Sequence, residues 1–174
     1  MDGDLLQHMT NVYWSLERMG RPEHVALAGL FHGIYGTHAL QGTQVFDLPD
    51  HRREEVRGLI GDRAEQLVYS FCVMTYDSLG KSVRNMMRPG GRPELWNRHT
   101  DSPLEITPEE FTDLLWLKFA DLLAHVPQLP PDTRDAVIAD YGPFWQMVAE
   151  DLGPEALAEW HQVFDQPRSV TGAG

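Results

Sequence analysis

The 174-residue sequence predicts an all-α protein, and three observations support this prediction. Apolar residues recur at the three- and four-residue spacing of a helix face along most of the chain. Glycine and proline stand where these periodic segments end, as they commonly do at helix termini. No segment carries the alternating pattern of a convincing β-strand. We therefore expect residues 1–168 to form a single helical domain.

The first half of the chain predicts four helices. One helix face runs through residues 5–19 and stops at a Gly-Arg-Pro sequence. Residues 23–34 are apolar on nearly every face, which predicts the central and most buried helix. Residues 36–50 contain glycine and proline and are expected to form a loop or a broken short helix. Residues 52–74 are periodic but interrupted at Gly61, which indicates two consecutive helices joined by a tight turn.

Residues 85–105 form the one long segment with few periodic apolar residues and several glycines and prolines. Loops of this length are commonly functional lids or mobile segments. We therefore expect either a lid over a binding site or an excursion without a role. The next segment, Thr107-Pro108-Glu109-Glu110, is typical of a helix start, because it combines an N-cap threonine, a proline at the first helical position and a glutamate three residues after the cap.

The helix that Thr107 opens is expected to continue until Pro127. Asp132 begins another helix, which the Tyr-Gly-Pro sequence at residues 141–143 is expected to bend or end. Gly153 and Pro154 introduce a last helix that is expected to end near Gln166 and Pro167. Residues 169–174 are expected to fray.

Composition excludes several classes of function. Acidic residues outnumber basic ones by 26 to 14, giving a formal net charge of −12 with neutral histidines, and such a charge repels nucleic-acid phosphates. Cys72 is the only cysteine, which excludes an intrachain disulfide and any multi-cysteine metal site. No stretch approaches the ~18 apolar residues of a membrane span, and the acidic start is unlike a signal peptide. We expect a cytoplasmic protein that binds neither nucleic acid nor membranes.

Three polar residues within apolar helix faces are candidates for chemistry. His8 lies on the apolar stripe of the first predicted helix, His32 at the end of the most apolar one, and Asp121 within the helix that follows Thr107. Burying an imidazole or a carboxylate without a partner costs several kcal/mol, so each needs a compensating group. The three could compensate one another around a metal ion. Alternatively, each is a core residue with an ordinary hydrogen-bonding partner.

The order of these residues resembles that of the HD-domain metal-dependent phosphohydrolases, above all the domains that hydrolyse guanosine tetra- and pentaphosphate alarmones. The resemblance covers roughly residues 5–125 and implies an HD-like helical bundle with His8, His32 and Asp121 as metal ligands. Three segments carry it: residues 26–32 (Ala-Leu-Ala-Gly-Leu-Phe-His), 60–68 (Ile-Gly-Asp-Arg-Ala-Glu-Gln-Leu-Val) and 118–122 (Lys-Phe-Ala-Asp-Leu).

The sequence also departs from that family. Gly33 stands where the His-Asp doublet has its aspartate, and Gly36 and Thr37 replace an acidic pair that is implicated in activating water. Residues 27–37 instead resemble a little-described bacterial and fungal family with an Ala-Gly-Leu-Phe-His-x-x-Tyr-Gly-Thr motif. The resemblance therefore implies a divergent member of the HD superfamily rather than an ordinary alarmone hydrolase.

Three functions remain compatible with His8, His32 and Asp121. Two imidazoles and one carboxylate suffice for a catalytic zinc or manganese ion that activates water, which gives a small-molecule hydrolase. The same set is the ligand set of mononuclear non-haem iron oxygenases, and some HD-type proteins are such enzymes. If the site holds no metal, the three residues line the pocket of a ligand-binding or scaffold protein.

Further candidates lie near these residues in the sequence. Tyr35 could donate a hydrogen bond to a developing oxyanion if the helix of His32 continues, or its ring could simply fill the core. Thr37 could take part in catalysis, or it could lie in an exposed loop. Glu65 lies on an apolar helix face and could interact with His8, His32 or Arg53 at the site, or it could form a buried structural salt bridge.

Two residues are candidates for ligand binding. Arg53 belongs to the only local basic cluster, residues 51–53, which could anchor a phosphate or carboxylate or form part of a solvated mixed-charge face. Trp96 lies in the long irregular segment, where it could close over a ligand or pack on the bundle surface. We expect the partner to be a small molecule. A homodimer is also compatible, because Trp145 and Trp160 are either core or dimer contacts. No role is predicted for His24, His99, His125 or His161.

Overall fold

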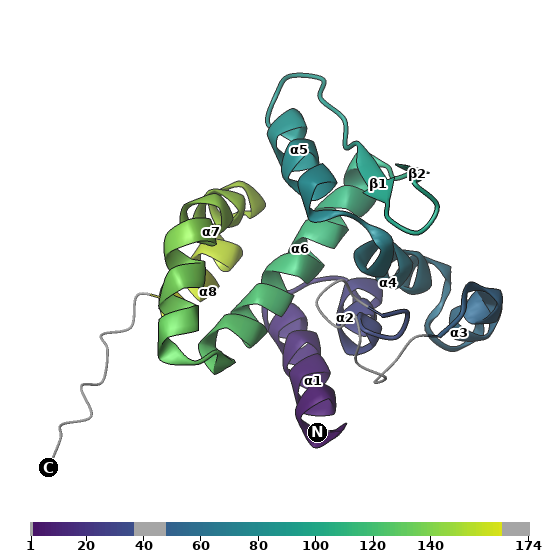
Figure 1. Cartoon of the computed structure of the whole chain (residues 1–174), viewed down its shortest axis with the longest axis horizontal. Helices are drawn as coiled ribbons and strands as arrows, with labels where there is room; N and C mark the ends of the chain where they lie inside the picture. The colour runs from purple at the N-terminus through teal and green to yellow at the C-terminus, as the bar shows by residue number, and fades with distance from the viewer. Residues whose placement is uncertain (1, 37–47, 165–174) are drawn as a thin grey trace, which may run out of the picture.

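The computed structural model describes residues 2–36 and 48–164, and within them it confirms an all-α protein (Figure 1). The described residues form eight α-helices, two short 3₁₀ turns and one two-stranded sheet. The helices are α1 (Asp2–Arg18), α2 (Glu23–Phe31), α3 (Arg53–Ile60), α4 (Asp62–Val73), α5 (Tyr76–Met86), α6 (Pro108–His125), α7 (Pro131–Leu152) and α8 (Pro154–Phe164). The 3₁₀ turns are η2 (Asp50–Arg52) and η3 (Val126–Gln128), and the strands are β1 (Leu95–Asn97) and β2 (Ser102–Leu104).

Helix α6 runs through the centre of the molecule, with α7 and α8 on one side and α1, α2 and α4 on the other (Figure 1). Half of its residues are buried. We expected the segment 23–34 to be the central helix, but α2 is shorter than predicted and packs against α6 from one side. The N-terminus of α6 confirms the predicted capping box between Thr107 and Glu110.

Two glycines set the helix boundaries that the sequence predicts. Gly20 follows α1 with a φ of 68°, and Gly61 separates α3 from α4 with a φ of 84°. Residues other than glycine rarely adopt this left-handed backbone conformation. Glycine therefore allows the chain to turn where one helix ends. The predicted pair of consecutive helices in residues 52–74 is thereby confirmed.

The expectation of no strand was wrong for residues 95–104, which form the antiparallel hairpin β1–β2. Each strand has only three residues, too few to give an alternating pattern in the sequence. The hairpin is attached to the end of α4, because the N–H of Thr75 donates to the carbonyl of Trp96 and the N–H of Arg98 donates to the carbonyl of Val73. A lid movement of the predicted kind would have to break these hydrogen bonds.

Two further helices differ from expectation. Helix α5 was not predicted, although Thr75 caps its start by accepting a hydrogen bond from the N–H of Ser78. Helix α7 continues through Pro143, where we expected a bend or an end. The buried side chains of Trp145 and Val148 follow the proline and hold this part of α7 against the core. The expected end of the last helix near residues 166–167 lies outside the described residues, as does the tail 169–174.

None of the helices in the described residues is both long and apolar enough to cross a membrane.

Helices α1 and α2 pack closely because α2 carries Gly29 at their contact. A Cβ atom added at Gly29 would lie 2.8 Å from a methyl carbon of Leu16, 3.1 Å from one of Val12 and 3.3 Å from the backbone nitrogen of Tyr13. Real Cβ atoms hardly ever approach other atoms so closely, so any side chain here must push α1 away. The packing of α1 against α2 therefore depends on this glycine.

We predict that Gly29→Ala destabilises the protein by about 1–3 kcal/mol, because the added methyl group overpacks the α1–α2 contact. Gly33→Ala is the matched control, since a Cβ there would meet only Met9, at an ordinary 3.4 Å. Urea denaturation of the two variants and the wild type measures the difference. Equal stability of the two variants would contradict the close contact at Gly29.

Candidate metal centre

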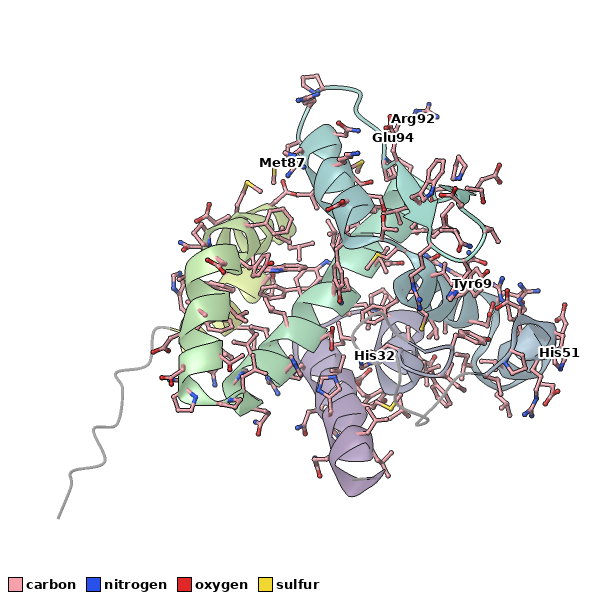
Figure 2. All side chains as sticks on the ribbon, viewed as in Figure 1. His32, His51, Tyr69, Met87, Arg92 and Glu94 are labelled. Atoms are coloured by element: carbon pink, nitrogen blue, oxygen red, sulfur yellow. The ribbon has the colours of Figure 1, made fainter. Side chains whose placement is uncertain are left out.

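His8, His32 and Asp121 come together from three helices, as the sequence predicts. His8 lies on α1 and Asp121 lies on α6. His32, which is labelled in Figure 2, caps the C-terminus of α2. The Nε2 atom of His8 is 3.0 Å from Oδ1 of Asp121 and 3.3 Å from Nε2 of His32. The Nε2 atom of His32 is 3.5 Å from the same carboxylate oxygen. Three potential ligand atoms therefore form a compact triangle.

The size of this triangle fits a metal ion. Ligand atoms about 2.1 Å from an ion lie about 3.0 Å apart in an octahedral arrangement and about 3.4 Å apart in a tetrahedral one. The three measured separations, 3.0, 3.3 and 3.5 Å, span these two values. An ion would therefore fit with little movement of the side chains. Within the described residues, no other group of three or more histidine, cysteine or acidic side chains has such a geometry.

The tautomer of His32 leaves a lone pair on Nε2, the ring nitrogen that belongs to this triangle. Its Nδ1 atom is 2.7 Å from the backbone carbonyl oxygen of Gly29. A carbonyl oxygen only accepts hydrogen bonds, so Nδ1 must carry the proton. In the neutral ring Nε2 then carries the lone pair that a metal needs. A hydrogen bond to a carbonyl is the usual way in which proteins orient a histidine ligand.

Asp121 is held ionised by its surroundings. Burial would raise the pKa of its carboxyl group, but the ammonium of Lys118 and the adjacent imidazoles of His32 and His8 lower that pKa well below its ordinary value. Lys118 donates to Oδ2 over 3.0 Å. Burial would likewise lower the pKa of Lys118, yet Asp121 and Tyr76 raise it above the ordinary value. The centre therefore contains a carboxylate and an ammonium ion.

The centre is closed on the side of His32 and partly open on the other. The side chain of His32 is 5% exposed, whereas those of His8 and Asp121 are 19% and 21% exposed. Within the described residues, His8 and Asp121 therefore form the more accessible side of the triangle. A bound molecule would thus meet these two residues first.

A second histidine–aspartate pair joins α2 and α6, two helical turns before the first. His24 near the start of α2 lies 2.8 Å from Asp113 near the start of α6. His32 and Asp121 follow at the other ends of these helices. In both pairs the histidine and the aspartate are separated by the same number of residues in the sequence. Helices α2 and α6 therefore run parallel and in register. Unlike Asp121, Asp113 has only one histidine partner; its other neighbour is Arg63, at 3.6 Å.

Three neighbours of the centre were not predicted to belong to it. Lys118 binds Asp121, the ring of Phe71 packs edge-on against His32 at 4.9 Å, and the ring of His125 packs edge-on against His8 at 6.0 Å. The positions of Lys118 and His125 could have been inferred from the sequence, because they lie three residues before and four residues after Asp121 on one helix. Phe71 could not, since it comes from α4.

Tyr35 and Glu65 contact each other rather than the histidines. Helix α2 ends at Phe31, so the continuation on which a role for Tyr35 depended is absent. The hydroxyl of Tyr35 donates to Oε1 of Glu65 over 2.8 Å. Glu65 is fully buried and also accepts two hydrogen bonds from Arg53, at 2.6 and 3.0 Å, and one from Arg57, at 3.0 Å. This is the buried salt bridge that the sequence left as the alternative for Glu65.

Arg53 and Trp96 also lie outside the triangle. The guanidinium of Arg53 is bound to Glu65 and lies 3.5 Å from the centroid of the Tyr69 ring. Trp96 is 40% exposed on β1, and its indole N–H donates to Asp101 within the same hairpin. Thr37 lies outside the described residues. Catalytic or ligand-binding roles for these residues stay predictions.

We predict that Glu65→Gln lowers the free energy of unfolding by about 3 kcal/mol at neutral pH, because it removes the negative charge that Arg53 and Arg57 surround. Burial would raise the pKa of Glu65, but the hydrogen bonds from Arg53, Tyr35 and Arg57 lower it below 4.5. A carboxyl group whose pKa is lowered in the folded state stabilises the fold at pH values above its ordinary pKa. This stabilisation is lost as the pH falls through the lowered pKa.

The difference in the free energy of unfolding between wild type and Glu65→Gln should therefore be largest at neutral pH. It should shrink as the solution is acidified below about pH 4.5. Urea denaturation at several pH values measures it. Glu55→Gln is the control, because this exposed glutamate pairs only with Arg52 and its removal should change stability little. A pH-independent difference would contradict an ionised Glu65.

Comparison with known families adds little to this geometry. Residues 1–75 of the chain match a family that is described as a domain of unknown function, DUF6817. The matched segment spans α1 to α4 and contains His8 and His32, whereas Asp121 lies beyond it. No curated protein and no solved structure matches the chain. The similarity therefore carries no activity over to this protein, and its chemistry has to be argued from the three helices that meet at the triangle.

Proposed function

We propose that the protein is a small-molecule enzyme with a mononuclear metal centre formed by His8, His32 and Asp121. One observation carries this proposal: three ligand atoms, from α1, the C-terminus of α2 and α6, lie 3.0–3.5 Å apart, and the Nδ1 proton of His32 leaves the lone pair on the nitrogen that belongs to this group. Hydrogen bonding of a core histidine to one partner would not require three such atoms to converge. Zinc, manganese and iron are all compatible with two imidazoles and one carboxylate.

The leading candidate is a hydrolase that has diverged from the HD-domain phosphohydrolases. A divalent ion held by these residues would supply Lewis-acid chemistry and would lower the pKa of a coordinated water molecule to near neutrality. His8, His32 and Asp121 supply three ligands and leave positions for water and substrate. An imidazole binds a metal only in its neutral form, and Lys118 already balances the charge of Asp121. The donor set therefore leaves the charge of the ion uncompensated, which favours an anionic nucleophile or an anionic substrate.

Gly33 supports divergence from the parent activity. It follows His32 directly, where the resembled enzymes have an aspartate ligand, and a Cβ atom at Gly33 would face Met9. This position contributes no negative charge and no ligand. With one anionic ligand fewer, the centre would differ in charge and in water activation from an alarmone hydrolase.

The second candidate is a non-haem iron oxygenase. The observation that favours it is the ligand set itself, since two histidines and one carboxylate with open positions are the ligands of such iron centres. A metal-free binding protein is the third candidate. It is favoured by the ion pair of Lys118 and Asp121, which lets the fold accommodate Asp121 without a metal. These candidates differ in the metal that the purified protein retains.

We predict that zinc, manganese or iron(II) raises the melting temperature of the wild type and not that of His8→Gln. At a hundredfold excess over the dissociation constant, binding adds about 2.7 kcal/mol to the free energy of unfolding, which thermal melts resolve. His24→Gln is the matched control, because it removes the histidine of the His24–Asp113 pair and leaves the triangle intact. An equal shift in all three proteins, or none in the wild type, would refute the metal centre.

Asp121→Asn alone would be a poor test of the same site. It would leave the ammonium of Lys118 buried without its carboxylate, and such a change costs about 3–5 kcal/mol whether or not a metal binds. The double variant Asp121→Asn with Lys118→Met removes both charges together. Its melting temperature should be independent of added metal, with a smaller loss of stability than Asp121→Asn alone.

We also predict the metal content and one activity. Protein purified under nitrogen, without chelators or an added histidine tag, should retain about one equivalent of metal per chain. Zinc or manganese would favour the hydrolase, and iron would favour the oxygenase.

Because Gly33 and Gly36 provide no carboxylates, turnover of guanosine tetraphosphate with manganese should be negligible by chromatography. Pyrophosphate release that disappears in His8→Gln would instead assign the parent activity to this protein.

A further inference from the structure

The two oxygens of the Asp121 carboxylate face different partners. Oδ1 is directed at the imidazoles, 3.0 Å from Nε2 of His8 and 3.5 Å from Nε2 of His32. Oδ2 accepts a hydrogen bond from the ammonium of Lys118 over 3.0 Å. Only Oδ1 therefore belongs to the triangle, while Oδ2 is occupied by a cation of the protein itself.

Lys118 is held in this position from several sides. Its side chain is buried, with a residue exposure of 6%, and its ammonium lies 4.1 Å from the centroid of the Phe71 ring and 5.2 Å from that of the Tyr76 ring. Aromatic faces attract cations, and the attraction is strongest where water is excluded. Phe71 also packs against His32, so one ring supports both the ammonium and an imidazole. The ammonium has little room to swing away from Asp121.

We propose that Lys118 is a positioning residue that withholds Oδ2, so that Asp121 offers a divalent ion one oxygen only. This inference rests on the proposed function. A carboxylate can bind an ion through one or both oxygens, and binding through both occupies an additional coordination position. By holding Oδ2, Lys118 keeps that position for water or substrate. Its charge also opposes that of the ion, so the centre binds metal less tightly than it would without the lysine.

The same contact limits the centre to a single ion. In sites with two metals, carboxylates commonly bridge the ions with one oxygen on each. Here the second oxygen is bound by the ammonium, which repels a second cation. We therefore expect one ion per chain in the wild type even at excess metal.

The test measures how Asp121 binds zinc in four proteins: wild type, Lys118→Met, Lys118→Gln and Lys81→Met. Lys81 is the only other lysine of the chain and is exposed on α5, which makes it the matched control. Infrared difference spectra of zinc-loaded and zinc-free protein, with aspartate carboxyl groups labelled with ¹³C, give the separation between the two carboxylate stretches. The separation is wide for binding through one oxygen and narrow for binding through both. Competition with a chromophoric chelator gives the zinc affinity.

We expect a wide separation between the two carboxylate stretches in the wild type and a narrow one in Lys118→Met. The zinc affinity of Lys118→Met should be about tenfold higher or more, because the opposing charge is removed. Lys118→Gln keeps an N–H donor for Oδ2 but no charge, so its separation should stay wide while its affinity rises. It also provides the comparison if Lys118→Met does not fold. Lys81→Met should match the wild type in both measurements.

Two results would overturn the role of Lys118 and leave the metal centre standing: a narrow separation in zinc-loaded wild type, or an affinity in both Lys118 variants that equals or falls below that of the wild type. A merely structural lysine gives the second result, because its loss can only loosen the ligands. Failure of the folded wild type to bind zinc, manganese or iron(II) would overturn the metal centre and the role of Lys118 together.

Discussion

Burying an imidazole or a carboxylate without a partner costs several kcal/mol, and this constraint governs how α1, α2 and α6 pack. Each of these helices is largely apolar where it meets the others, and each carries one polar side chain at their common contact: His8, His32 and Asp121. The helices can approach closely only if these side chains meet. Gly29 makes the approach close enough, and its carbonyl oxygen also orients His32. Packing and site geometry are therefore consequences of the same contact.

Helix α4 connects this centre with a second polar network. Near its N-terminus, Glu65 binds Arg53, Arg57 and the hydroxyl of Tyr35. Near its C-terminus, Phe71 supports His32, and the thiol of Cys72 donates to the carbonyl oxygen of His32. The turn from His32 to Tyr35 thus contacts α4 at both ends. It is fixed by the hydrogen bond from Tyr35 to Glu65 at one end and by ring packing and the hydrogen bond from Cys72 at the other, which explains how a histidine just beyond the end of a helix is held in place.

The sequence predicted the features that depend on local chemistry. The capping box at Thr107 and the turn at Gly61 are properties of a few neighbouring residues, and the structure confirms both. His8, His32 and Asp121 could be singled out because each interrupts an apolar pattern. The hairpin β1–β2 was missed because three-residue strands carry no periodicity, and they are held by hydrogen bonds to α4 that no local pattern reveals. Tyr35 was linked to His32 on the assumption of a longer α2, whereas tertiary contacts with Glu65 determine its position.

The paired arrangement of His24 with Asp113 and His32 with Asp121 has a consequence for how this fold can change. Two helices joined at two points cannot slide by one turn, about 5.4 Å, without breaking both contacts. The alignment of α2 with α6 thus does not rest on the metal centre alone. His24 and Asp113 lie about two helical turns from the triangle, where they hold the register whatever residues occupy the triangle. Substitutions can alter the ligands, and with them the chemistry, while the scaffold remains aligned.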